Sequence, residues 1–163
     1  MDNSTLKRLF EHMAWANRKL FSQLADLPEE TLQLSAWDPE WTVGKIANHI
    51  VIGQGRYISR LQKVEAPIED EFPLTSQGMK DLIIQSYEHD NKVLDLIDTP
   101  EEKITFIRFG ETLEYLSSTV LAQSIYHATE HRAQIVDTLA FNNVHVIRLD
   151  DYDHWAFERS QKN

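Results

Sequence analysis

The sequence predicts an all-α fold, a four-helix bundle with a short extended or hairpin insert before the fourth helix. Four long segments carry apolar residues at spacings of three and four, which places those residues on one face of a helix. The segment before the last of them is instead rich in β-branched and aromatic residues around a glycine, as hairpins are. The chain has 163 residues, 42% of them apolar. We therefore expect residues 1–163 to form a single domain.

The first helix is predicted over residues 4–27, where Ser4 or Thr5 can cap its start. Pro28 follows, and a helix usually ends at or before the residue that precedes a proline. The apolar face of this helix is made by Leu6, Leu9, Met13, Ala16, Leu20, Leu24 and Leu27.

The second helix is predicted from Val43 to about Val64, with Thr42 as its cap. The connector before it carries Trp37 and Trp41 around a proline. We expect these two rings to pack over one end of the core, or alternatively to line the mouth of a pocket.

The rest of the chain is predicted to form a third helix over residues 76–97, an extended hairpin over 104–115 and a fourth helix over 117–141. Asn142 and Asn143 are a plausible stop for the fourth helix, since asparagine tolerates a left-handed backbone. A short helix near residues 151–159 is expected to dock through Trp155 and Phe157.

Composition and charge exclude several classes of function. The net charge is −10 and the basic residues are scattered, so the electrostatic footprint of a nucleic-acid-binding protein is missing. No secretory signal or membrane-spanning run is present, which indicates a cytoplasmic protein with no membrane partner. The chain has no cysteine, so any metal must be held by imidazole or oxygen ligands.

Two histidines of the predicted fourth helix have the spacing of metal ligands. His127 and His131 are four residues apart, so they project from the same face of the helix. His49 lies on or beside the apolar face of the predicted second helix and supplies a third imidazole if the two helices are neighbours. Three imidazoles with open positions are typical of a catalytic site. The alternative is that these are ordinary surface or core histidines.

Other polar residues are weaker candidates for a part in such a site. His12 is expected at a boundary or on the surface, and His89 is expected to be exposed. Gln123, Gln134, Asn48 and Asn17 are candidates for holding the second nitrogen of an imidazole. Gly53 lies one turn from His49 and either permits close helix packing or leaves space beside the site. Tyr57 and Arg56 could face an anionic or thiol ligand.

The sequence resembles the DinB/YfiT-like family of metal-binding four-helix bundles over nearly its whole length. The resemblance lies in three segments, which run from His12 to Asn17, from Trp41 to Ile50 and from Tyr126 to Ile135. It implies an up-down-down-up bundle, often a homodimer, in which His49, His127 and His131 bind one divalent metal. Zinc or nickel is expected first, with iron, manganese or copper as alternatives. The resemblance also implies a small-molecule substrate. Some related proteins transfer groups to or from a low-molecular-weight thiol, and others are described as metal-dependent hydrolases.

Two positions depart from the pattern of many relatives, which have His-His-Arg-Gly-Gln where this chain has Glu130-His131-Arg132-Ala133-Gln134. The second ligating histidine is kept, while its neighbours differ. Glu130 also creates a His-x-x-Glu-His match, in which the glutamate of a metallopeptidase acts as general base. Glu130 projects about 100° away from His131 on a helix, so a surface or supporting role is the better interpretation.

The leading functional hypothesis from the sequence is a metal-dependent enzyme that activates a low-molecular-weight thiol, as an S-transferase does, or water, as a hydrolase does. The alternative is a non-catalytic, metal-binding, dimeric bundle protein related to stress. A third hypothesis, a bundle that binds no metal, requires the three histidines to lie apart or to be satisfied by internal hydrogen bonds.

Overall fold

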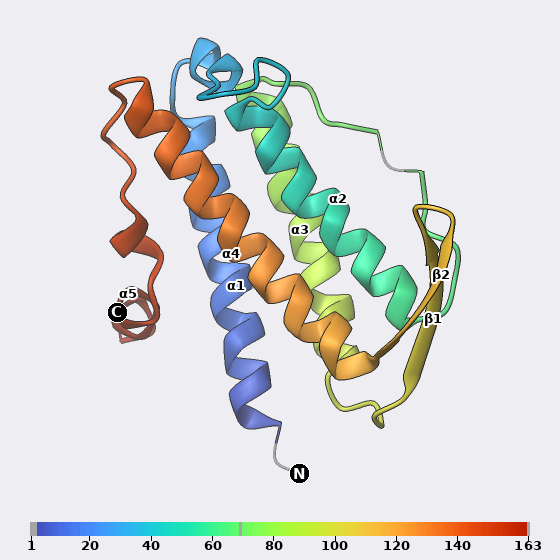
Figure 1. Ribbon diagram of the computed structural model, residues 1–163. Helices are drawn as coiled ribbons and strands as arrows, with labels where there is room; N and C mark the ends of the chain where they lie inside the picture. Colours follow the sequence, from blue (N-terminus) through green and yellow to red (C-terminus); the bar gives the residue numbers. More distant parts are fainter. Residues whose placement is uncertain (1–2, 69, 163) are drawn as a thin grey trace.

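The protein is mostly helical. The computed structural model describes residues 3–68 and 70–162, and over these residues it contains five α-helices, two short 3-10 helices and one two-stranded sheet (Figure 1). The elements in chain order are α1 (Ser4–Ala25), η1 (Glu29–Gln33), α2 (Val43–Leu61), α3 (Ser76–Leu96), β1 (Lys103–Arg108), β2 (Glu111–Leu116), α4 (Ser117–Phe141), η2 (Leu149–Tyr152) and α5 (His154–Ser160).

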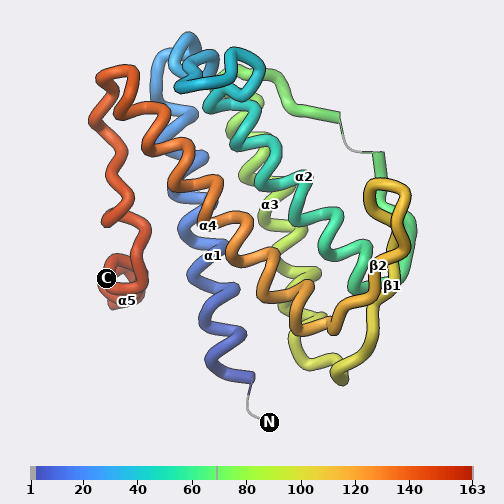
Figure 2. The backbone as a smooth tube through the Cα atoms, viewed as in Figure 1, coloured from blue at the N-terminus to red at the C-terminus, as the bar shows by residue number. Residues whose placement is uncertain are grey.

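The four long helices lie side by side and enclose the core. Helix α1 packs mainly against α3, and α2 packs mainly against α4, while α2 also touches α3 and α1 touches α4. The backbone trace in Figure 2 shows α2 and α4 along one face of this group. The predicted apolar faces meet in the interior, where the large side chains that are fully buried include Phe21, Leu20, Ile46, Leu82 and Ile135.

Two polar side chains fix the start of α2. The Thr42 hydroxyl caps the helix by accepting a hydrogen bond from the backbone of Lys45 at 3.4 Å, as predicted. Asn48 is buried and accepts from the backbone N–H of Phe72 at 2.7 Å while it donates to the Phe72 carbonyl at 3.2 Å. The long connector that leads to α3 is thereby tied to the same end of α2.

The insert before α4 is an antiparallel hairpin in which Arg108 pairs with Glu111 at the turn. The two turn residues, Phe109 and Gly110, have φ angles of 54° and 81°, and positive values at both positions are the pattern of a tight type I′ hairpin. The hairpin lies beside the C-terminal end of α2 (Figure 1). The guanidinium of Arg60 stacks over the ring of Phe106 at 4.4 Å and so links α2 to β1.

The C-terminal segment packs against α1 and corrects two expectations. His12 is buried rather than at the surface: its Nε2 lies 2.7 Å from the carbonyl of Tyr152, and its ring stacks on His154 at 3.8 Å. Phe157 is buried as expected, whereas Trp155 is 74% exposed. Asp153 caps helix α5. Trp155 and Phe157 are two positions apart on it and project about 200° from each other, so both rings cannot face inward.

His89 also differs from its prediction. Its acidic neighbours in the sequence suggested an exposed position, but α3 turns the imidazole inward, where it is only 3% exposed. One ring nitrogen lies 2.9 Å from the amide of Gln85. The expected cap of α1 is different too, since Asn3 occupies the cap position and neither Ser4 nor Thr5 does.

Within the described part of the chain, no helix has both the length and the apolar character that crossing a membrane requires.

Candidate metal centre

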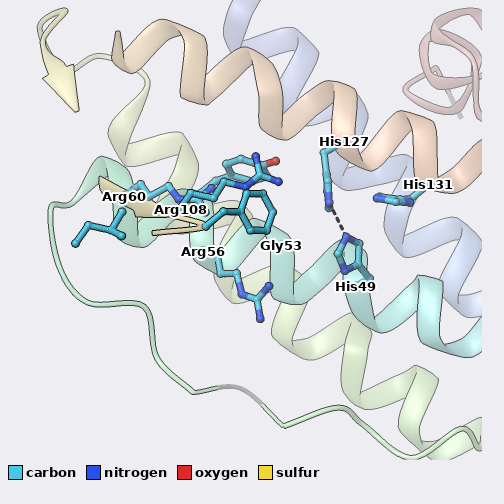
Figure 3. Close-up of a pocket in the computed structure, with 10 residues that line it drawn as sticks. His49, Gly53, Arg56, Arg60, Arg108, His127 and His131 are labelled. Carbon is cyan, nitrogen blue, oxygen red and sulfur yellow. Dashed lines mark hydrogen bonds between the residues drawn. The ribbon is translucent and has the colours of Figure 1, made fainter. Parts of the chain in front are cut away.

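The three histidines singled out in the sequence come together between α2 and α4. One ring nitrogen from each of His49, His127 and His131 lies within 4.8 Å of the others. The rings of His49 and His127 point toward each other across the space between the helices (Figure 3), with their Nε2 atoms 3.0 Å apart. All three side chains are half-buried. Helices α2 and α4 are neighbours, so the condition under which His49 was expected to join His127 and His131 is met.

The donor set fits a small divalent metal ion. Two imidazole nitrogens bound to one tetrahedral zinc ion at ~2.0–2.1 Å lie about 3.3 Å apart, close to the separation between the His49 and His127 nitrogens. No other group of three or more potential ligand side chains is found in the portion of the chain that the structure describes. The cluster can hold a divalent ion of the kinds that favour imidazole nitrogen.

Gln134 orients the third imidazole. Its side-chain oxygen lies 2.7 Å from Nδ1 of His131 and accepts a second hydrogen bond, from the indole N–H of Trp41, at 3.4 Å. Because an amide oxygen only accepts, Nδ1 of His131 carries the proton and Nε2 keeps its lone pair for a ligand. This is the usual way in which a protein fixes the tautomer of a metal-binding histidine.

Aromatic rings and a glycine fit closely around the histidines. Trp41 packs edge-on against His49 and His131, with ring centres 5.0 and 5.9 Å away. A side chain at Gly53 would put its Cβ 2.5 Å from Cε1 of His127. Gly53 therefore makes room for the imidazole rather than for the backbone of another helix.

Two of the histidines, His49 and His127, are held in the neutral form that metal binding requires. Burial, then the charge of His131 and that of Arg56, lowers the pKa of His49 to about 4. Burial, followed by the charges of His131, His49 and Arg108, lowers the pKa of His127 to about 3. Protons therefore compete weakly with a metal ion for these nitrogens at neutral pH.

The other candidates of the sequence lie elsewhere. Gln123 and Glu130 are exposed. Gln123 therefore does not support His127, and an exposed Glu130 gives the peptidase interpretation no structural basis. Asn48 binds the connector at Phe72. Asn17 accepts a hydrogen bond from the buried Arg132 at 2.7 Å, in the core. Of the four polar candidates, only Gln134 reaches a histidine.

A cavity of about 550 Å³ opens beside the histidines. Its walls come from α2, α4 and the hairpin, and they are formed by His49, Gly53, Arg56, Tyr57, Arg60, Ile107, Arg108, Phe109, His127 and His131. The volume suits a small organic molecule. The sequence indicated Arg56 and Tyr57, but not Arg60, Arg108 or Phe109. Arg108 and Phe109 reach the cavity only because the hairpin folds against the end of α2, and its local pattern does not encode that placement. Arg60 is on α2 itself, one turn after Arg56.

The chain was compared with known proteins. A search of curated proteins found no match. The model of the DinB family matches residues 1–141, a span that includes all four long helices and the three histidines. The chain belongs to the DinB family.

Proposed function

We propose that this protein binds one divalent metal ion through His49, His127 and His131 and uses it to activate a small-molecule nucleophile. The nucleophile is a low-molecular-weight thiol or a water molecule, and the electrophile occupies the adjoining cavity. The observation that carries the proposal is the convergence of three imidazoles, with ligand atoms within 4.8 Å, at one wall of a cavity.

The chemistry of such a centre follows from its ligands. A divalent ion bound there acts as a Lewis acid that lowers the pKa of a coordinated water or thiol. The protein's own contribution is to hold the nitrogens of His49 and His127 unprotonated and to keep His131 in one orientation through Gln134 and Trp41.

Transfer of a thiol is the preferred reaction within this proposal. The preference comes from the family resemblance, since neither a thiol nor water is selected by any single side chain. The chain has no cysteine, so the sulfur must arrive on a second substrate. Tyr57 lies beside His127, with ring centres 5.5 Å apart, and its hydroxyl is a candidate donor to the electrophile or its leaving group.

The position of the cavity favours catalysis over simple metal storage. A structural metal site is normally closed by four protein ligands, whereas a catalytic one keeps a position for water or substrate. Three protein ligands are gathered here within the described residues, and the cavity borders all three. This arrangement supports an enzyme rather than the non-catalytic, dimeric alternative.

The proposal includes the helix order expected from the sequence. We propose that the four long helices form an up-down-down-up bundle, in which α2 and α3 run in the same direction. The long connector between these helices, which returns along the length of α2 in Figure 1, supports that order.

Metal content tests the first half of the proposal. Protein purified without a histidine tag is analysed for bound metals, alongside His49→Ala, His127→Ala and His131→Ala. His145→Ala is the matched control, since His145 is exposed and lies outside the cavity. We expect about one equivalent of metal in the wild type and the control, and a loss in the other three. Equal metal content in all five proteins would refute the site.

Reaction chemistry tests the second half. The metal-loaded protein is mixed with an electrophile and a panel of small thiols, and consumption of free thiol is followed. A parallel assay without thiol measures hydrolysis of ester and amide substrates. Turnover that requires both thiol and metal supports transfer, and turnover that requires only metal supports hydrolysis. A fully loaded protein that is inactive in both assays would favour the non-catalytic alternative.

A further inference from the structure

Three arginines surround the cavity next to the histidines. Arg56 and Arg60 come from α2, and Arg108 comes from the last position of β1. In Figure 3 the labelled arginines lie on one side of Gly53 and the labelled histidines lie on the other. The two groups therefore occupy opposite ends of one cavity, and no aspartate or glutamate lines it among the described residues.

Among the described residues, these arginines have no acidic partner, whereas several other basic side chains do. Other basic side chains form ion pairs, such as Arg18 with Asp90, Lys63 with Glu102 and Lys103 with Glu114. Over residues 3–68 and 70–162, none of the cavity arginines has a carboxylate within ion-pair distance. The chain has a net charge of −10, so acidic residues are in excess. Because no described acidic residue lines the cavity or pairs with its arginines, their positive charge faces the cavity.

Arg60 is the best positioned of the three. Its guanidinium lies over two aromatic rings, 4.4 Å from the centre of Phe106 and 5.3 Å from the centre of Tyr57. Ring stacking holds the planar group in place while its N–H donors stay free for an oxyanion. Burial lowers the pKa of Arg60, and the nearby charges of Arg108 and Arg56 act in the same direction. An anion in the cavity would relieve that repulsion.

We infer that the ligand of this cavity is a small molecule bearing a carboxylate or phosphate group, which Arg60 binds directly with Arg56 and Arg108 beside it. The inference rests on the proposed function, because it names the class of substrate presented to the histidine centre. A divalent ion at the histidines would add further positive charge to the same cavity. Guanidinium groups bind both oxyanions in a forked geometry, so the structure assigns their shared chemistry.

Binding measurements with defined probes test this inference. Isothermal titration is performed with succinate, inorganic phosphate and the uncharged succinamide, on protein stripped of metal by a chelator and on zinc-loaded protein. We expect succinate or phosphate to bind and succinamide not to. The stronger of the two anions identifies the oxyanion, and its affinity should fall as sodium chloride is added.

Arginine variants locate the binding. Arg60→Gln should weaken anion binding by about tenfold, the value of a charge-assisted hydrogen bond in a partly buried site. Arg56→Gln and Arg108→Gln, at exposed positions, should each cost roughly threefold. Arg159→Gln is the control, because it removes an exposed arginine that does not line the cavity. Circular dichroism establishes that each variant is folded.

Two results would overturn the inference: similar affinities for succinate, phosphate and succinamide, or an equal loss of affinity in Arg159→Gln and Arg60→Gln. Comparison of the two protein forms separates this inference from the proposed function. Anion binding that depends on Arg60 in stripped protein, combined with a wild type that takes up no zinc, would refute the metal centre alone. Zinc binding without anion selectivity would refute the substrate class alone.

Discussion

The imidazole of His127 occupies the space that a side chain at Gly53 would need. A methyl group there would lie 2.5 Å from Cε1 of the ring, well inside van der Waals contact. The imidazole on α4 therefore fits against α2 only because position 53 has no side chain. A helix interior is otherwise a poor place for glycine, which costs about 1 kcal/mol relative to alanine.

Gly53→Ala should consequently separate metal binding from folding. The alanine displaces His127 from its position opposite His49, and we expect zinc affinity to fall by about tenfold or more. The thermal stability of the metal-free protein should change little, because the gain in helix propensity offsets the shift of the ring. Competition with a chromophoric chelator measures the affinity. Unchanged zinc binding would show that metal binding does not depend on the space that Gly53 leaves for His127.

Gln134→Ala should weaken the metal site through His131. Without the amide oxygen, Nδ1 of His131 loses its acceptor at 2.7 Å, and loss of such a partner typically costs 10–100-fold in metal affinity. Gln123→Ala is the matched control, since it changes the same residue type at an exposed position of the same helix. Chelator competition on both variants decides the matter, and similar losses would contradict the role given to Gln134.

His89 should make the stability of the fold depend on pH. Burial lowers its pKa to about 4 from an ordinary value of 6.5. The unfolded chain then binds more protons than the folded one between these two values, so stability rises with pH across that window. The neutral form of His89 contributes roughly 3 kcal/mol to the free energy of unfolding. This contribution is complete above pH 6.5 and is lost as pH falls toward 4.

Urea unfolding of metal-free protein at several pH values between 4 and 7 tests this contribution. His89→Gln should lose less stability than the wild type as the solution is acidified. His145→Gln, at an exposed position, should follow the wild type. Parallel curves for the wild type and His89→Gln would show that His89 does not set the slope.

Phe109→Asn should stabilise the hairpin and alter the cavity. A non-glycine residue with φ of 54° is strained by about 1 kcal/mol, and asparagine tolerates this region better than phenylalanine. We expect the free energy of unfolding to rise by several tenths of a kcal/mol to about 1 kcal/mol. Binding of small molecules should weaken, since an aromatic wall beside Arg108 is removed. Urea unfolding and ligand titration measure the two effects, and a less stable variant would contradict the strain argument.

Much of the helical framework and the histidine cluster could be predicted because their signals are local. The periodic apolar faces located the four long helices, and the fourth was placed at its observed bounds, Ser117–Phe141. The spacing of His127 and His131 fixed a shared face, and only one partner on a neighbouring helix had to be found. Thr42 marked the start of α2 through its side-chain hydroxyl, and Asn143 marked the end of α4, where it has a positive φ.

The features that escaped prediction depend on contacts between distant segments. The sequence around His12 does not reveal that the C-terminal segment will cover it. The acids beside His89 masked the inward turn of its side chain. Arg108 looks like any strand-end arginine until the hairpin is packed against α2. Tertiary contacts decided each of these positions, and a periodic pattern carries no information about them.

Helix α2 carries His49, Arg56 and Arg60 on one rigid rod. Seven residues separate the first two, a rise of about 10 Å along the axis. This spacing acts as a gauge, because the backbone of a packed helix does not stretch or shorten. A molecule that reaches both the imidazoles and the guanidinium groups must bridge the part of that interval that the side chains leave open, so shortening it by methylenes should cost contact at one end.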